Sequence, residues 1–213
     1  MKKSMLLLSV LLSCSLFSSA QDLSHKVIVG GVLDFSSGND DTETSTRKFT
    51  RFGVQPMVGY YLSPKVVVGI AGSYLYHKYE TNYELSTTID SENKTNTYLF
   101  GPFARYHFNL GEKFSFFLHL EALYGKENGK STHISDDIKD VYELDGNLFQ
   151  TLLEPGIIYR VTDKIFLEAQ FLRIYYAYAK TEETSEGREP TTEKSSSFGA
   201  SLNRIGFGLA VLF

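Results

Sequence analysis

Apolar and aromatic residues recur at every second position in eight stretches of the chain. This period of two is typical of a β-strand whose two faces meet different surroundings. Between 114 and 124, for example, every even position is apolar or aromatic, whereas Ser115, His119 and Glu121 lie at odd positions. The predicted strands are 26–36, 49–62, 66–78, 96–108, 114–125, 147–160, 165–179 and 196–213.

The connections between these strands alternate in length. Short turns are predicted at 63–65, 109–113 and 162–164, and long polar stretches at 37–48, 79–95, 126–146 and 180–195. The long stretches show no apolar periodicity, which indicates mobile, solvated loops. An even number of strands with alternating short and long connections predicts an eight-stranded antiparallel up-and-down transmembrane β-barrel, with short periplasmic turns and long outer loops.

The face opposite the apolar one combines glycines with isolated charges. A face exposed to water would carry many lysines and glutamates and few glycines, so this mixture predicts a narrow, crowded lumen, with the apolar face toward lipid. Buried charges must pair, which favours a structural salt-bridge network that plugs the lumen over a polar channel or proton path. The predicted lumen residues are Asp34, Gln55, Arg105, His119, Glu121, Glu154, Arg160, Glu168, Gln170 and Arg204.

A Pro-x-x-x-Tyr motif occurs three times, each time before a short turn that ends in lysine. Proline cannot donate to a β-ladder, so each motif predicts a bulge or local irregularity. The tyrosines are expected at the periplasmic interface, where an amphipathic ring is favoured. The repeats span 56–60, 102–106 and 155–159, and the lysines are Lys65, Lys113 and Lys164.

Residues 1–20 have the order of a cleaved secretory signal. Two lysines precede a short apolar run, and Ser18, Ser19 and Ala20 precede Gln21. Cleavage there leaves a barrel domain at 21–213. Two alternatives are an uncleaved anchor, although the apolar run is too short to span a bilayer as a helix, and lipidation of Cys14 in a loose lipobox.

Composition narrows the chemistry of the mature chain. Removing Lys2 and Lys3 lowers the 21 Lys and Arg to 19, against 25 Asp and Glu, a net charge of about −6. This acidic balance argues against a nucleic-acid partner, which would require a basic stripe. Cys14 is the single cysteine, so the mature chain has no disulfide, thiolate nucleophile or cysteine-based metal site.

No catalytic, cofactor or metal site is predicted. His133 and Ser135 with Glu143 have the residue types of a hydrolase but lie in an expected loop without a scaffold. Ser115, His119 and Glu121 share one face, yet steps of about 7 Å along a strand place nucleophile and base too far apart. The acidic groups at 39–41 and 135–137 lack the spacing of a calcium loop.

These features resemble the small porin-like outer-membrane β-barrel domains of Bacteroidota, similar in shape to the transmembrane domain of outer-membrane protein A. The resemblance is carried by the leader, by the repeated hairpins and by the final strand 206–213. It implies a location in the outer membrane, contact with outer-membrane lipid, and an insertion signal at Phe213 that the barrel-assembly machinery reads. It carries over no catalytic motif.

We therefore expect a structural or interaction role, in which a plugged barrel presents four long loops outside the cell. A narrow porin-like channel for small solutes is one alternative. Another is a soluble periplasmic lipocalin-like binder of an apolar ligand. In that binder Phe116, Leu118 and Leu120 would line a cavity and Glu121 would meet water.

Overall fold

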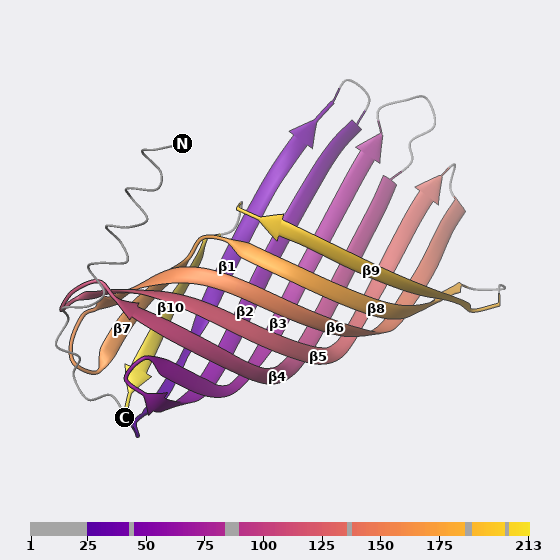
Figure 1. Ribbon diagram of the computed structural model, residues 1–213. Coiled ribbons are helices and arrows are strands. Elements are labelled where there is room, and N and C mark those ends of the chain that lie inside the picture. Colours follow the sequence, from indigo (N-terminus) through magenta and orange to yellow (C-terminus); the bar gives the residue numbers. More distant parts are fainter. Residues whose placement is uncertain (1–24, 43–44, 84–89, 136–137, 186–188, 203–204) are drawn as a thin grey trace, which may run out of the picture.

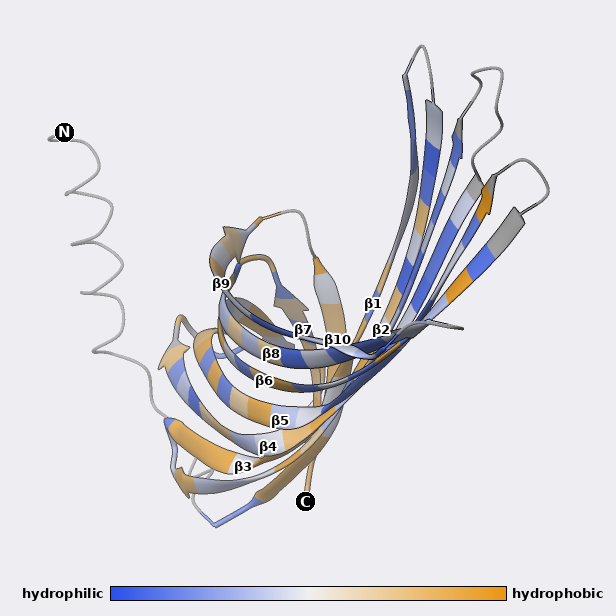
Figure 2. Ribbon diagram, turned by 90° about the vertical axis from the view of Figure 1, so that its right-hand side faces the viewer, coloured by the Kyte–Doolittle hydropathy of each residue, from blue (hydrophilic) through white to orange (hydrophobic). Residues whose placement is uncertain are grey.

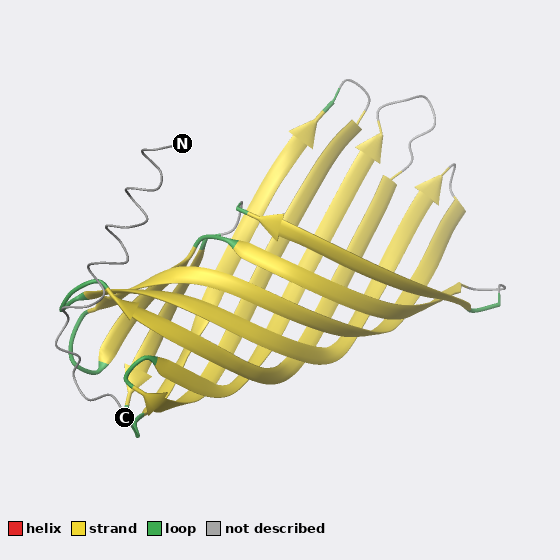
Figure 3. Cartoon of the chain, viewed as in Figure 1, coloured by secondary structure: helices red, strands yellow, loops and turns green. Residues whose placement is uncertain are grey.

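The described part of the chain is built of antiparallel β-strands (Figures 1 and 3). The computed structural model describes residues 25–42, 45–83, 90–135, 138–185, 189–202 and 205–213. No helix within these ranges is long and apolar enough to cross a membrane. The strands are β1 (Val27–Asp41), β2 (Ser45–Ser63), β3 (Val66–Tyr83), β4 (Asp90–Asn109), β5 (Phe114–Ser135), β6 (Ile138–Arg160), β7 (Ile165–Gln170), β8 (Arg173–Ser185), β9 (Thr191–Ser201) and β10 (Gly206–Leu212).

Eight strands close into a ring. Its order is β1-β2-β3-β4-β5-β6-β7-β10, and pairing of β10 with β1 completes it. Strand β8 pairs with the far part of β6, and β9 pairs with β8. The predicted up-and-down barrel is confirmed. Its last two predicted strands, 165–179 and 196–213, are each broken in two, which gives ten strands within the described ranges.

The apolar face points outward, as predicted. Leu118 is 36% exposed and Leu120 is 51% exposed, whereas His119 is 1% and Glu121 is 4% exposed. Apolar residues concentrate in the closed ring, and the strand extensions beyond it are mostly hydrophilic (Figure 2). This facing contradicts the lipocalin-like alternative, which would place Leu118 and Leu120 in a cavity and Glu121 in water.

The prediction of long loops is wrong for most of the polar stretches. Strands β5 and β6 run as far as Ser135 and from Ile138, and β4 begins at Asp90, so most of 126–146 and part of 79–95 are strand. The same holds for much of 37–48 and 180–195. Both faces of these extensions meet water, so their side chains need not alternate even though the backbone ladder continues. We call the extensions the arms.

Each proline of the repeated motif interrupts the ladder on one side only. Pro56 stays in register with Gly31 of β1 but is skipped in the pairing with β3. Pro102 pairs with β3 and is skipped toward β5. Pro155 pairs with Leu118, and its other side faces the break between β7 and β8. The predicted irregularities are confirmed in this form, which fits a residue without an N–H donor.

The tyrosines of the motif lie at the end of the ring that carries the short turns. Tyr60, Tyr106 and Tyr159 are 39%, 41% and 36% exposed on the outer face. The ring of Tyr159 lies 5.0 Å from that of Phe114, between centroids. An outward aromatic row therefore marks the short-turn end, as the repeat predicts.

Candidate functional site

The lumen of the ring holds a layer of buried polar side chains. Of the predicted lumen residues, Arg160 is half-buried near the short turns, with its guanidinium 5.9 Å from the ring centroid of Phe166. Arg204 lies outside the described residues. The remaining predicted residues are inward and at most 9% exposed: Asp34, Gln55, Arg105, His119, Glu121, Glu154, Glu168 and Gln170.

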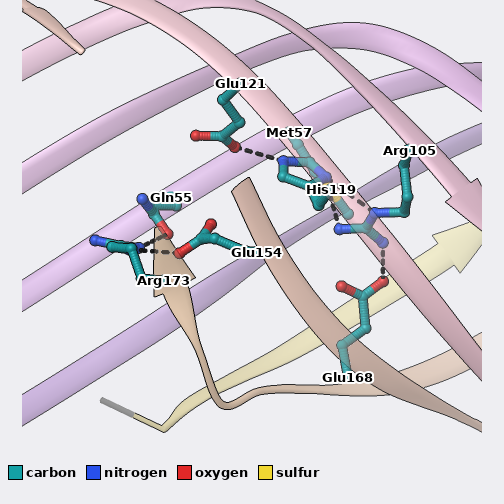
Figure 4. A network of polar contacts seen from close by, with 8 residues as sticks. All are labelled: Gln55, Met57, Arg105, His119, Glu121, Glu154, Glu168 and Arg173. Atoms are coloured by element: carbon teal, nitrogen blue, oxygen red, sulfur yellow. Dashed lines mark hydrogen bonds and ion pairs between the residues drawn. The ribbon is translucent and has the colours of Figure 1, made fainter. Parts of the chain in front are cut away.

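Arg105 is the centre of this layer (Figure 4). Its Nη1 donates to Oε1 of Glu168 at 2.6 Å, and its Nε donates to Nδ1 of His119 at 3.0 Å. Its Nη2 lies 3.4 Å from Sδ of Met57. The guanidinium also lies 4.3 Å from the ring centroid of Phe117. A single cation thus ties β4 to β2, β5 and β7 across the lumen.

The contacts of His119 determine which ring nitrogen carries a proton. Because Nδ1 accepts from Arg105, the hydrogen lies on Nε2, which donates to Oε1 of Glu121 at 2.6 Å. Phe103 stacks on the imidazole at 4.9 Å between centroids. His119 and Glu121 are in direct contact because the glutamate side chain reaches along the strand. The predicted separation concerned the nucleophile and the base, Ser115 and His119. Arg105, not Ser115, is bound to the other nitrogen.

A second ion pair lies beside the first and was missed in the sequence. Nε of Arg173 donates to Oε1 of Glu154 at 2.5 Å, and Nη2 lies 3.4 Å from Oε1 of Gln55. In an unbroken strand 165–179, Arg173 would face lipid, because Glu168 and Gln170 already face inward. The break between β7 and β8 shifts the alternation by one residue and turns Arg173 inward. The need of buried Glu154 for a basic partner was the signal that could have found it.

Together these residues form the lumen cluster, whose polar contacts are shown in Figure 4. Its members are Gln55, Met57, Arg105, His119, Glu121, Glu154, Glu168 and Arg173. A small cavity of about 10 Å³ lies beside Gln55, Glu154 and Arg173. Another, of about 20 Å³, lies toward the short turns, beside Tyr61 and Ile158. On the arm side a vestibule of about 510 Å³ begins at Arg173 and Gln55. The lumen is therefore filled at one level and open on one side of it.

Glycines on the inner face make room for this filling. A Cβ atom on Gly156 would lie 2.3 Å from Cζ of Phe117, and one on Gly53 would lie 2.3 Å from Oδ2 of Asp34. Phe117 is completely buried. The glycines predicted for a crowded lumen therefore allow large side chains on neighbouring strands to cross it.

The other catalytic candidate is not assembled. His133 lies in β5 and not in a loop, and its Nε2 is 3.1 Å from Oγ of Ser131. It is paired across the ladder with Asp140, whereas Glu143 is opposite Lys130. The side chain of Ser135 lies outside the described residues. Among the described residues no carboxylate forms an ion pair with His133, so its contact with Ser131 lacks the third member of a triad.

The geometry offers no metal centre in the described residues, where no three His, Cys, Asp or Glu side chains are placed to hold an ion. Residues 39–41 lie at the end of β1, and 136–137 lie outside the description. In the lumen cluster the Oε2 atoms of Glu121, Glu154 and Glu168 have no hydrogen-bond partner among the described residues. The cluster is thus a set of neighbouring buried ion pairs.

Comparison with known proteins gives one family and several related folds. The profile of the outer membrane protein beta-barrel domain matches residues 6–210. A major outer membrane protein from Thermus thermophilus has 14% identity and a TM-score of 0.50, over 89% of this chain and 100% of that one. OprG from Pseudomonas aeruginosa has 14% identity and a TM-score of 0.42, over 91% and 99%.

The outer membrane protease OmpT from Escherichia coli has 10% identity and a TM-score of 0.40, over 91% of this chain and 98% of that one. No curated protein sequence matches the chain. At these identities the solved structures bear on the fold alone, and the Thermus protein supports the barrel architecture.

Proposed function

Because this chain belongs to the family of outer membrane protein beta-barrel domains, we propose that it spans the outer membrane as a plugged barrel and presents its arms outside the cell. In this role the ring is an anchor, and the arms and the loops that join them are the interacting part. Four connections lie at the arm end, between β1 and β2, β3 and β4, β5 and β6, and β8 and β9.

The outer face of the ring supports the membrane-spanning part of this proposal. The apolar side chains of β5 extend from Phe114 to Tyr124, about eleven residues, and a transmembrane strand needs roughly 9–11. The outward faces of β2, from Phe52 to Leu62, and of β4, from Tyr98 to Phe108, have the same length of about eleven residues. Aromatic side chains lie at both ends of this band on β4 and β5, where the interfaces would be.

The lumen cluster is the observation that best supports a lumen closed by side chains. Arg105 and Glu168 are each 1% exposed as side chains, and Arg173 and Glu154 are 12% and 3% exposed. Removing one partner of such a buried pair is costly, so both pairs resist displacement by a passing solute. An eight-stranded ring is also just wide enough for side chains to fill.

We also propose that the protein is not an enzyme. The contact between His119 and Glu121 has the form of a base and its orienting carboxylate. It lies below the vestibule, and the imidazole is held between Arg105 and Glu121. His119 therefore has no ring nitrogen left to activate a serine hydroxyl.

The vestibule favours one alternative, a narrow channel for small solutes. It reaches the lumen cluster from the arm side, and both acidic and basic residues line it, including Glu127, Arg51 and Arg173. A solute that entered it would meet the ion pair of Arg173 and Glu154. Opening would then require that pair and the Arg105–Glu168 pair to separate.

Ion conductance across planar bilayers tests the proposal. We expect no steady current from the wild-type barrel and a current from a variant in which Arg105, Glu154, Glu168 and Arg173 are all replaced by Ala, because this variant lacks both ion pairs. Arg51→Ala, in the vestibule, is the control and should stay closed. Heat-shifted mobility on gels confirms that each protein is folded. A steady wild-type current would overturn the plugged state and favour the channel.

The termini complete the proposal. We propose that residues 1–20 direct export and are then removed, and that the assembly machinery reads Phe213 on the last strand. Assignment to the Bacteroidota branch of the family is proposed on the resemblance of the hairpin repeats. Mass measurement of the protein from purified outer membranes tests the first point: a mature chain that begins at Gln21 is expected, and a retained or lipidated leader contradicts it.

A further inference from the structure

A row of lysines crosses the outer face of the barrel just beyond its aromatic band. Lys126 of β5 is directly opposite Asn147 of β6, which is opposite Lys180 of β8, which is opposite Lys194 of β9. All three lysines are exposed. The next row toward the ring has Tyr124, Phe149 and Tyr178, which are 60%, 38% and 40% exposed, and ends with Ser196 on β9. The basic row therefore borders the aromatic edge of the membrane band.

The same order of side chains appears on most of the strands. Going outward along β3, Lys78 follows Tyr76 and precedes Glu80, and along β8, Lys180 follows Tyr178 and precedes Glu182. Asp145 of β6 and Asp41 of β1 are the exceptions among the described strands. On the others the first charged residue of the outer face beyond the aromatic band is a lysine: Lys48, Lys78, Lys94, Lys126, Lys180 and Lys194.

We call these six lysines the collar. Two parts of the collar differ in how the charge of the lysines is balanced by carboxylates. On β3 and β4, Lys78 lies 2.6 Å from Glu80 and 3.0 Å from Glu92, and Lys94 lies 2.5 Å from Glu92. Lys126, Lys180 and Lys194 form no ion pair with any described residue. The nearest carboxylates in the register, Asp145 and Glu182, lie one row further out.

The positive charge of Lys126, Lys180 and Lys194 is energetically unfavourable unless an anion lies beside these side chains. Lys180 and Lys194 are directly opposite on the ladder, and like charges in that position destabilise a sheet. A lysine at this height can lay its stem along apolar surface and hold its ammonium at the level of lipid headgroups. Basic residues beside a membrane gain about 1 kcal/mol each from anionic lipid.

We propose that Lys126, Lys180 and Lys194 bind the phosphate groups of lipids in the outer leaflet. This inference rests on the proposed orientation of the barrel, with its arms outside. A lipid is the expected occupant because the lysines adjoin the aromatic edge of the band, so one molecule can place its acyl chains against Tyr124 and Tyr178 and its phosphate against the lysines. Lys78 and Lys94 contribute less, because Glu80 and Glu92 already neutralise them.

Lipid capture by the purified barrel tests this inference. The folded protein, in a nonionic detergent, is titrated with a bisphosphorylated glucosamine lipid (lipid A) and with the same lipid after removal of its phosphates, and bound lipid is counted by native mass spectrometry. We expect the wild type to prefer the phosphorylated form by at least about tenfold, and added salt to reduce this preference. Equal binding of the two lipids would overturn the proposal, and needs no variant.

Two triple variants locate the site. Replacing Lys126, Lys180 and Lys194 by Gln should remove at least about tenfold of the affinity for the phosphorylated lipid. Replacing Lys65, Lys113 and Lys164 by Gln removes the same charge at the short-turn end and should leave that affinity within about twofold. Arginine at the three collar positions should keep binding. An equal loss in both triple variants, or a loss only at the short-turn end, would overturn the assignment.

These outcomes are separate from failure of the proposed function. A wild type that conducts ions but prefers the phosphorylated lipid would reject the plug and keep the lipid site. A plugged wild type that ignores the lipid phosphates would do the reverse.

Discussion

The ring half of the barrel and its arms share the same strands but are held together differently. In the ring, every strand pairs on both sides, and large inward side chains such as Phe117, Leu123 and Leu152 are buried. In the arms, residues 37–41 of β1 pair only with β2, and β9 pairs only with β8. The described arms therefore form an open sheet above a closed ring.

The difference shows that backbone pairing alone does not close this barrel. The inner face of β9 carries Ser195, Ser197 and Gly199, which offer nothing apolar to pack against β1. The free edge of β9 is polar, and the charges of Glu193 and Lys194 disfavour pairing of this edge with another chain. Closure occurs where the lumen is filled with side chains and the outside is apolar, because burial there adds to the ladder hydrogen bonds.

The largest effect should come from emptying the centre of the ring. Arg105→Ala leaves Glu168 and the His119–Glu121 pair without their cation, and breaking a buried pair costs about 3–5 kcal/mol. Arg51→Ala, in the vestibule, removes the same charge where no ion pair with a described residue is lost, and should change stability by at most about 0.5 kcal/mol. Urea unfolding of both variants in detergent micelles measures the difference. Similar losses would mean that ring and arms are equally coupled.

A smaller effect should follow from overfilling the lumen. Gly156→Ala places a methyl group against the ring of Phe117, and overpacking typically costs about 1–3 kcal/mol. Gly72→Ala is the matched control, because the nearest atom to its Cβ, Cγ of Pro56, is 3.6 Å away. Its stability should stay within about 0.5 kcal/mol of wild type. The urea midpoints compare the two, and an unchanged Gly156→Ala protein would show that the lumen is loosely packed.

The smallest effect should come from the ion pairs of the arms. Lys94 and then Lys78 hold the pKa of Glu92 below its usual value of 4.5, and Glu80 and then Glu92 raise the pKa of Lys78. Because the folded pKa of Glu92 is the lower one, its contribution is present above about pH 4.5 and is lost as the pH falls through the folded pKa. These side chains are more than a quarter exposed, so the contribution should stay below about 1 kcal/mol.

The variant Glu92→Gln checks this expectation. At pH 7 its urea midpoint should lie slightly below that of the wild type, and the gap should narrow as the pH falls below about 4.5 and through the lowered pKa of the wild-type carboxylate. A gap that widens toward acid would contradict the sign of the linkage. A gap as large as that of Arg105→Ala would contradict the division between ring and arms.

The sequence by itself determined the parts of the barrel in which two faces meet different surroundings. The period of two located all eight strand paths, and it identified the outward face of β5 because Leu118 and Leu120 alternate with His119 and Glu121. It also identified most of the lumen cluster, since charges on an otherwise apolar strand must face the interior. These are local properties of a pleated strand between lipid and a packed lumen.

Only the tertiary structure decided the rest. The arms continue as strands without an alternating pattern, because water lies on both sides and hydrogen bonds to neighbouring strands maintain them. Arg173 turns inward because the inward–outward alternation shifts by one residue between Gln170 and Arg173, where β7 ends and β8 begins. The period of two in the sequence does not reveal this shift. The pairing of Arg105 with Glu168, which are 63 residues apart, depends on ring closure. Contacts across the lumen depend on the position of every strand together, and no single stretch of sequence contains that information.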